Sequence, residues 1–139
     1  MYAFLIYGDL NLMKNMMKSF TVACAFVLSV AASPAVAGDV KAGAKVFKKC
    51  KACHVVDAEK NKTGPHLVNI MGRKAGTLES YSKYSKAIQA ADIVWDEATL
   101  DAYLTKPKAY IKGTRMAFAG LRKEADRANV IAYLKSFSE

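Results

Sequence analysis

The chain has 139 residues, 53% of them hydrophobic, and carries a formal net charge of +9. This length is enough for one small domain. A strongly basic balance is typical of proteins that bind nucleic acid or acidic partners.

The first 37 residues have the pattern of a secretory signal peptide. Lys14 and Lys18 form a positive region, residues 19–36 carry no charge, and Ala35-Val36-Ala37 is an A-x-A cleavage site. A positive region, an apolar region and a small-residue site in this order predict export and cleavage. We therefore expect residues 1–37 to be removed and the mature protein to be periplasmic. The alternative is an uncleaved membrane anchor, for which the apolar stretch is near the lower length limit of a spanning helix.

Residues 1–12 look odd in front of such a leader, because Met13, Met16 or Met17 would each make a more ordinary start. Removal of residues 1–37 leaves the 102 residues 38–139, with 19 basic and 11 acidic side chains and a net charge of +8. Export from the cytoplasm argues against nucleic acid as the partner of this basic chain.

A first helix is expected to begin at Asp39, a good capping residue, and to carry Val40, Ala44 and Phe47 near one face. Gly43 is a poor helix former, so we interpret it as a point where another helix comes close, the alternative being a tolerated surface glycine. This helix is predicted to run into the sequence Cys50-Lys51-Ala52-Cys53-His54.

That sequence is the C-x-x-C-H pattern of covalent c-type haem attachment, in which two thiols add to the haem vinyl groups. One helical turn presents both sulfurs to one porphyrin edge, and His54 then brings an imidazole under the iron as proximal ligand. A redox dithiol or half a zinc site would use the same cysteine pair. A thioredoxin-like βαβ context is not visible, and the only further cysteine and histidine are Cys24, in the removed segment, and His66.

The remaining elements follow from capping residues, glycines and apolar spacing. Leu100, Tyr103 and Leu104 form an apolar helical face. No strand pattern appears, so the fold is predicted to be all-α, a few helices wrapped around one covalently attached haem. In chain order we expect a loop over 57–67, an irregular segment over 72–80, a short helix over 84–91, a helix from the Asp96 cap to a stop at Pro107, a loop over 108–120 and a last helix over 123–136.

The sixth position of the iron has three candidate donors besides lysines: His66, Met71 and Met116. His66 is only twelve residues past His54 and would have to cross at once to the opposite haem face. Met71 is expected to pack in the core. Met116 lies in a glycine-bearing loop with 62 residues available to wrap around the haem, so geometry favours it. A His/Met pair leaves no open site, which points to electron transfer rather than catalysis.

An ordered series of motifs runs through residues 38–139, and with it the chain resembles a bacterial class I cytochrome c, similar to mitochondrial cytochrome c. The resemblance rests on Gly38-Asp39-Val40, Cys50-x-x-Cys53-His54, Thr63-Gly64-Pro65-x-Leu67, Gly72-Arg73-Lys74-x-Gly76, Tyr84-Ser85, Trp95, Leu100-x-x-Tyr103-Leu104, Pro107-Lys108-x-Tyr110-Ile111-x-Gly113-Thr114-x-Met116-x-Phe118-x-Gly120 and Ala128-x-x-Ile131-Ala132-Tyr133-Leu134.

The resemblance implies roles for further residues around one haem c. The Pro65 carbonyl would accept a hydrogen bond from His54 and fix its tautomer. Tyr103 would donate a hydrogen bond near the Met116 sulfur, and Phe118 would shield the iron from water. The resemblance also implies that a haem propionate is held by Arg73, Tyr84 and Trp95, and that Ser85 and Thr114 add hydroxyl donors. It further implies that the first and last helices cross, with Gly43 and Phe47 packed against Val130 and Tyr133.

Three residues depart from the family pattern. Lys112 stands where proline is frequent, so the Met116 loop is expected to be less stiff. Asn69 stands where glycine is usual, which leaves the turn before Met71 open. Ile88 replaces a frequent asparagine in the haem pocket and removes a polar neighbour of the Met116 side.

Together these features predict a soluble periplasmic monohaem electron carrier, a monomer without a small-molecule substrate and not an enzyme. The resemblance implies that it shuttles electrons from the cytochrome bc complex to a terminal oxidase or photosynthetic reaction centre. The alternative is a haem peroxidase or gas-binding sensor with a labile sixth ligand. A basic ring around the haem edge would steer the protein to acidic membrane partners, and it consists of Lys49, Lys62, Lys108, Arg115 and Lys123.

Overall fold

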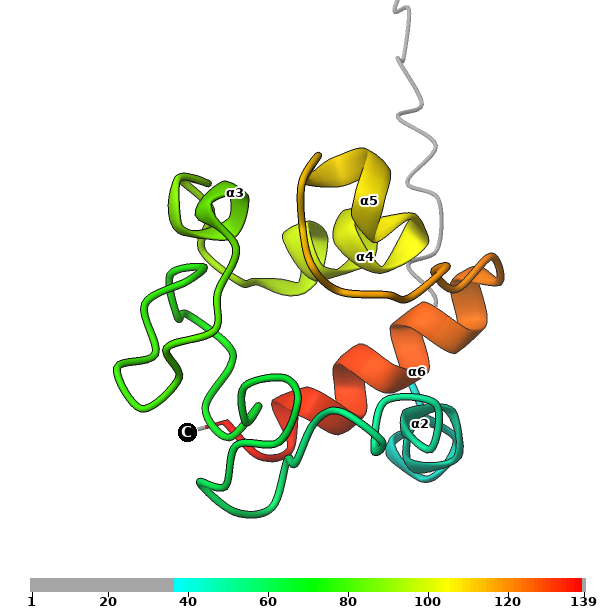
Figure 1. Ribbon diagram of the computed structural model, residues 1–139. Coiled ribbons are helices and arrows are strands. Elements are labelled where there is room, and N and C mark those ends of the chain that lie inside the picture. The colour runs from blue at the N-terminus through cyan, green and yellow to red at the C-terminus, as the bar shows by residue number, and fades with distance from the viewer. Residues whose placement is uncertain (1–36, 139) are drawn as a thin grey trace, which may run out of the picture. The chain divides into compact units, whose positions relative to one another are not determined.

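The computed structural model describes residues 37–138, so all but the last residue of the predicted signal peptide lies outside the described part of the chain. Within residues 37–138 the only β pairing is one isolated bridge between Lys74 and Val94. The expected all-α fold is confirmed. The helices, in chain order, are α2 (Val40–Phe47), α3 (Lys86–Gln89), α4 (Glu97–Thr105), α5 (Pro107–Tyr110) and α6 (Glu124–Lys135) (Figure 1). None of these helices is long and apolar enough to cross a membrane.

Helix α2 packs directly on α6, as Figure 1 shows with α2 seen end-on. The Asp39 side chain caps α2 by accepting a hydrogen bond of 2.6 Å from the Ala42 amide. A Cβ added at Gly43 would lie 2.7 Å from the carbonyl carbon of Asn129 and 2.7 Å from the Cβ of Tyr133. The predicted close approach at Gly43 is therefore confirmed, because only a residue without a side chain fits there.

The first helix ends earlier than predicted, because α2 stops at Phe47 and irregular turns carry the chain to His54. The amides of Cys53 and His54 both donate to the Cys50 carbonyl, at 3.0 and 2.9 Å. One tight turn thus presents both thiols and the imidazole, and it is joined to α2 by hydrogen bonds from the Cys50 and Lys51 amides to the Phe47 carbonyl.

Helix α4 begins with a reciprocal capping box in which Asp96 and Thr99 each bond the other's backbone amide. Its buried face consists of Leu100, Tyr103 and Leu104, as the spacing predicted. The helix ends at Thr105, just ahead of Pro107, also as predicted.

Residues 108–120 were wrongly predicted to be loop throughout, since α5 occupies Pro107–Tyr110. Proline lacks an amide hydrogen and has a helical φ, so it can end one helix and start the next. The short helix predicted over 84–91 is present but spans only Lys86–Gln89, because the hydroxyl of Ser85 caps it.

The turn before Met71 depends on Asn69, whose φ of 51° lies in the left-handed region. Asparagine tolerates this conformation better than other residues with a side chain. Asn69 thus adopts a left-handed conformation that glycine would also allow.

Candidate functional site

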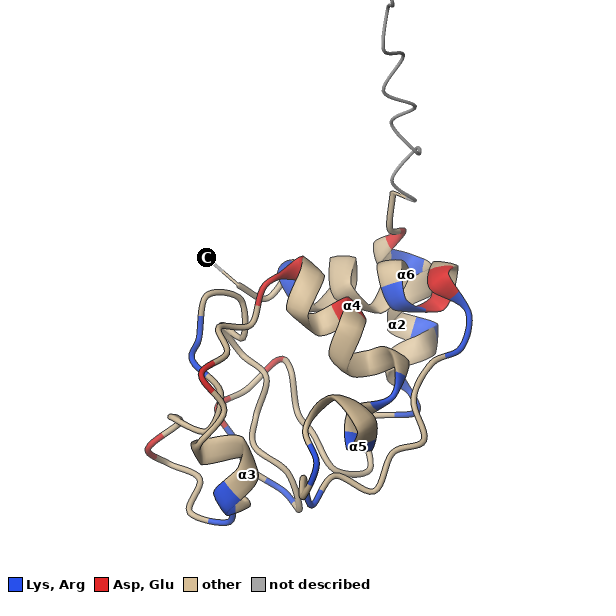
Figure 2. Ribbon diagram, turned by 90° about the horizontal axis from the view of Figure 1, so that it is seen from above, with Lys and Arg blue, Asp and Glu red and all other residues tan. Residues whose placement is uncertain are grey.

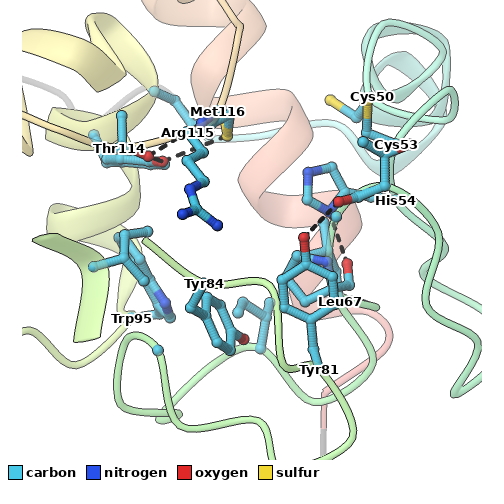
Figure 3. A pocket seen from close by; sticks show the side chains of 18 of the residues that line it. Cys50, Cys53, His54, Leu67, Tyr81, Tyr84, Trp95, Thr114, Arg115 and Met116 are labelled. Carbon is cyan, nitrogen blue, oxygen red and sulfur yellow. Dashed lines mark hydrogen bonds between the residues drawn. The ribbon is translucent and has the colours of Figure 1, made fainter. Parts of the chain in front are cut away.

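A cavity of about 480 Å³ lies among α4, α6 and the loops, with Phe47 of α2 at its edge. Most of its wall is apolar and comes from buried residues such as Ile70, Leu100 and Val130. Figure 3 shows the two cysteine sulfurs and the His54 imidazole on one side of this cavity, and the Met116 sulfur on the other. Of the predicted site residues, the structure brings these to the cavity wall: Cys50, Cys53, His54, Pro65, Arg73, Tyr84, Ser85, Trp95, Tyr103, Thr114, Arg115 and Met116.

The His54 ring is fixed by its neighbours on the 61–66 segment. Its Nδ1 lies 2.7 Å from the Pro65 carbonyl oxygen, which can only accept, so Nδ1 carries the proton and Nε2 keeps a free lone pair. A Cβ at Gly64 would lie 2.9 Å from Nδ1, which shows how closely the backbone packs on the ring. Burial lowers the pKa of His54, and the bond to Pro65 offsets this only in part. The ring is therefore neutral at neutral pH and able to bind a metal.

The Met116 sulfur is held from the opposite side of the cavity. The Tyr103 hydroxyl donates to Met116 Sδ at 3.4 Å, and Thr114 Oγ1 lies 3.4 Å from the same hydroxyl. Burial raises the pKa of Tyr103, so the phenol stays protonated as a donor. His66 and Met71, the other donors considered, do not line the cavity, and Met71 packs against the core.

The polar part of the wall lies near Arg73, whose guanidinium donates to the carbonyls of His66 and Val68 at 2.9 and 3.2 Å. Tyr84 and the buried Trp95 line the cavity with it. Burial raises the pKa of Tyr84, so this phenol is also a donor at neutral pH. This group of donors suits an anionic substituent. Ser85 is 6% exposed and its hydroxyl accepts from the Ile88 amide at 3.2 Å.

The two cysteines of the C-x-x-C-H sequence form no disulfide in the described part of the chain, and Cys50 is half-buried and Cys53 exposed. Burial raises the pKa of Cys50 to about 11, so this sulfur is a neutral thiol at neutral pH. Two thiols beside an apolar cavity, with an imidazole and a thioether on its opposite walls, fit a covalently attached haem.

The predicted basic residues have different surroundings. Arg115 lines the cavity, and its guanidinium lies 3.4 Å from the Lys83 carbonyl. Lys49 forms an ion pair of 3.8 Å with Asp126, and the Lys62 ammonium donates to the Lys51 carbonyl at 2.8 Å. Lys108 lies on α5 and Lys123 immediately precedes α6.

Phe118, predicted to shield the iron, packs against the core outside the cavity wall.

Sequence reasoning missed two residues beside the site. Tyr81 lines the cavity, stacks edge-on against Tyr84 with ring centroids 4.9 Å apart, and donates its hydroxyl to the Thr63 carbonyl. Asn61 bonds both the His66 amide and Ser80. Neither residue belongs to a motif, so spacing gave no signal for them.

Residues 40–138 match the model of a protein family described as Cytochrome c. The chain is 48% identical over 119 residues to cytochrome c-554 of Methylosinus trichosporium, covering 84% of this chain and 89% of that protein. It is 45% identical over 103 residues to cytochrome c-550 of Nitrobacter winogradskyi, covering 73% and 94%. The solved structure of cytochrome cH from Methylobacterium extorquens is similar with a TM-score of 0.67 and 41% identity, covering 71% of this chain and 99% of that one.

Proposed function

This chain belongs to the cytochrome c family, whose members are electron carriers with covalently attached haem c, and we propose that it is a periplasmic monohaem carrier with His/Met ligation. In this proposal His54 and Met116 bind the iron, and Cys50 and Cys53 form the two thioethers. The observation that carries the proposal is the placement of His54 and Met116 on opposite walls of one apolar cavity (Figure 3).

The bound haem supplies one-electron cycling between ferrous and ferric iron, and the chain sets the conditions for it. The Pro65 carbonyl holds the His54 tautomer that leaves Nε2 free for the metal. The Tyr103 hydroxyl holds the Met116 sulfur toward the cavity. With His54 and Met116 as its two protein ligands, the iron would offer no open position to a substrate, which argues against a peroxidase or gas sensor.

We assign the haem propionate contacts to Arg73, Tyr84 and Trp95, which line the cavity together. The Arg73 guanidinium supplies a positive charge, and the Tyr84 phenol and Trp95 indole supply hydrogen-bond donors. Thr114 and Ser85 also line the cavity, and the Ser85 hydroxyl accepts a hydrogen bond from the Ile88 amide in the α3 cap. The predicted shielding of the iron by Phe118 gains no support from the cavity, because Phe118 packs against the core outside the cavity wall.

The direct test adds purified ferrous protein to membranes of the source organism and follows its oxidation. We expect oxidation that an inhibitor of the terminal oxidase blocks, or that light drives where a reaction centre is the acceptor. Reduction should depend on the cytochrome bc complex. Rapid carbon monoxide binding by the ferrous protein at neutral pH, with no membrane-dependent oxidation, would instead assign it to the sensor or peroxidase class.

We further propose that the precursor is cleaved between Ala37 and Gly38 and that residues 38–139 act as a monomer in the periplasm. Gly38 supports this boundary, because a Cβ there would lie 2.7 Å from the Cβ of Ala132 on α6. Gly38, the residue after the proposed cut, therefore packs against the folded domain. Amino-terminal sequencing of the exported protein should read Gly38-Asp39. Intact leader in protein that needs detergent for release would establish the membrane-anchored alternative.

The proposed docking face for acidic membrane partners consists of Lys49, Lys62, Lys108, Arg115 and Lys123. It is supported most strongly at Arg115, which lies at the cavity one residue from Met116. Positive charge at the exposed haem edge would orient the carrier during encounter with an acidic complex.

A further inference from the structure

The segment 61–66 forms much of the environment of His54 but contains no helix or strand. Its Pro65 carbonyl binds the ring Nδ1 at 2.7 Å, and its Gly64 packs on the ring. Backbone hydrogen bonds, such as that of 2.9 Å from the Gly64 amide to the Cys53 carbonyl, hold this segment, and two residues that sequence reasoning missed add side-chain hydrogen bonds to it.

Asn61 makes three of these hydrogen bonds through its side-chain amide. Its Oδ1 accepts from the His66 amide at 2.9 Å, and its Nδ2 donates to the Ser80 carbonyl at 2.7 Å and to Ser80 Oγ at 3.1 Å. A backbone N–H only donates and a backbone carbonyl only accepts, so the orientation of this amide is unambiguous. A second tie between the same two segments is the Tyr81 hydroxyl on the Thr63 carbonyl.

The Pro65 carbonyl and the His66 amide belong to one planar peptide group. This group donates to Asn61 at one end and accepts from His54 at the other. Hydrogen bonds in such a chain polarise one another, so donation to Asn61 makes the Pro65 oxygen a stronger acceptor. Asn61 also fixes the plane of the peptide relative to the His54 ring.

We propose that Asn61 is a positioning residue for the iron ligand: through the Pro65–His66 peptide it strengthens the His54 hydrogen bond and so lowers the reduction potential. This inference rests on the proposed function, in which His54 binds the iron. A stronger bond at Nδ1 makes the imidazole a more basic ligand. A more basic ligand favours ferric iron, which lowers the potential. Loss of the Asn61 acceptor therefore raises the potential, whereas loss of the Met116 thioether lowers it.

The test compares Asn61→Leu with Asn61→Asp in the haem-loaded protein. The leucine variant removes both the acceptor and the donor, so we expect a higher potential and an upfield shift of the His54 Nδ1 proton in the NMR spectrum of the ferrous protein. The aspartate variant keeps the acceptor for the His66 amide but loses donation to Ser80. We expect its Nδ1 proton to stay at or downfield of the wild-type position at neutral pH, and to move upfield when acid protonates the new carboxylate.

The matched controls are Asn129→Leu and Asn129→Asp, because Asn129 accepts a similar bond of 2.8 Å from the Asp39 amide on the other side of the domain. They should leave both the potential and the Nδ1 proton unchanged. Asn61→Leu that loses stability but keeps the wild-type potential and Nδ1 position would overturn the proposal, leaving Asn61 a purely structural tie. If Asn61→Leu does not fold, the Asn61→Asp variant still tests the proposal. An NMR position of its His54 Nδ1 proton that does not change with pH would overturn the proposal equally. Wild-type protein without iron ligation by His54 would instead refute the proposed function.

Discussion

Gly43→Ala is the sharpest test of the packing between the first and last helices. Two effects oppose each other at this position. Alanine stabilises a helix by about 1 kcal/mol relative to glycine, which would favour α2. The added methyl, however, would lie 2.7 Å from the Asn129 carbonyl carbon and from the Tyr133 Cβ, and closer still to the Asn129 carbonyl oxygen.

The structure indicates that the clash is the larger effect. Ordinary contact begins at 3.4 Å, so α2 and α6 must separate by at least about 0.7 Å. The opposing atoms are the Asn129 backbone and the Tyr133 Cβ, which is fixed to the helix backbone, so neither can turn aside and we take the upper end of the overpacking cost, about 3 kcal/mol. Phe47, which is 1% exposed and packs 5.3 Å from Tyr133, loses a further amount of about 0.5 to 1 kcal/mol. The net destabilisation is therefore about 2.5 to 3 kcal/mol.

Guanidinium unfolding of the haem-loaded protein measures this difference, and thermal unfolding should show a fall in Tm of about 10 °C or more. Lys45→Ala lies on the exposed side of the same helix and should change the free energy of unfolding by less than about 0.5 kcal/mol. If Gly43→Ala instead gained the 1 kcal/mol that helix propensity alone predicts, the close approach of α2 and α6 would be refuted.

Three further predictions follow from the site and the surface. Met116→Ala should lower the reduction potential and admit carbon monoxide, whereas Met71→Ala should do neither; loss of the sulfur-to-iron charge-transfer band in the second variant would contradict the ligand assignment. The Thr99 amide lowers the pKa of Asp96, so Asp96→Ala should reduce Tm at neutral pH, by an amount that shrinks as pH falls below the unfolded value of about 3.9. A pH-independent difference would exclude the charged cap. Lys108→Glu should slow oxidation by an acidic acceptor and weaken its salt dependence more than Lys41→Glu on α2; equal slowing by both variants would leave only net charge.

The helices could be predicted where a local signal was complete. Asp96 offers a capping side chain, and an apolar face with helical spacing follows it. The predictions that α4 exists, that Asp96 caps its start and which of its residues are buried were therefore all correct. Pro107 gave an incomplete signal. A proline shows where one helix stops, but whether a new turn begins depends on contacts of the following residues, and α5 was missed for this reason.

The site could be predicted where a residue's own chemistry defines its role. Cysteine, histidine and methionine are haem-binding residues at defined spacings, and the structure places Cys50, Cys53, His54 and Met116 around one cavity. Asn61 has no such chemistry. Its role depends on the backbone of His66 and Ser80, whose positions are set by irregular segments that apolar spacing cannot locate.

The distribution of charge over the surface could be predicted least from the sequence. The net charge does not show which basic and acidic side chains lie close enough to cancel each other. In the described part of the chain, α4 and α6 carry carboxylates that pair with basic residues, as Asp126 does with Lys49 and Glu97 with Lys135 (Figure 2). Such exposed pairs add little stability, yet each cancels a charge that a distant partner would otherwise meet. No ion pair is found for Lys108 or Arg115 among residues 37–138, so no carboxylate cancels these two charges on α5 and the Met116 loop. Lys49 is therefore the weakest member of the proposed docking face. Lys135→Glu would be a poorer control than Lys41→Glu for the Lys108→Glu experiment. It would break the 2.6 Å ion pair with Glu97 in addition to changing the net charge.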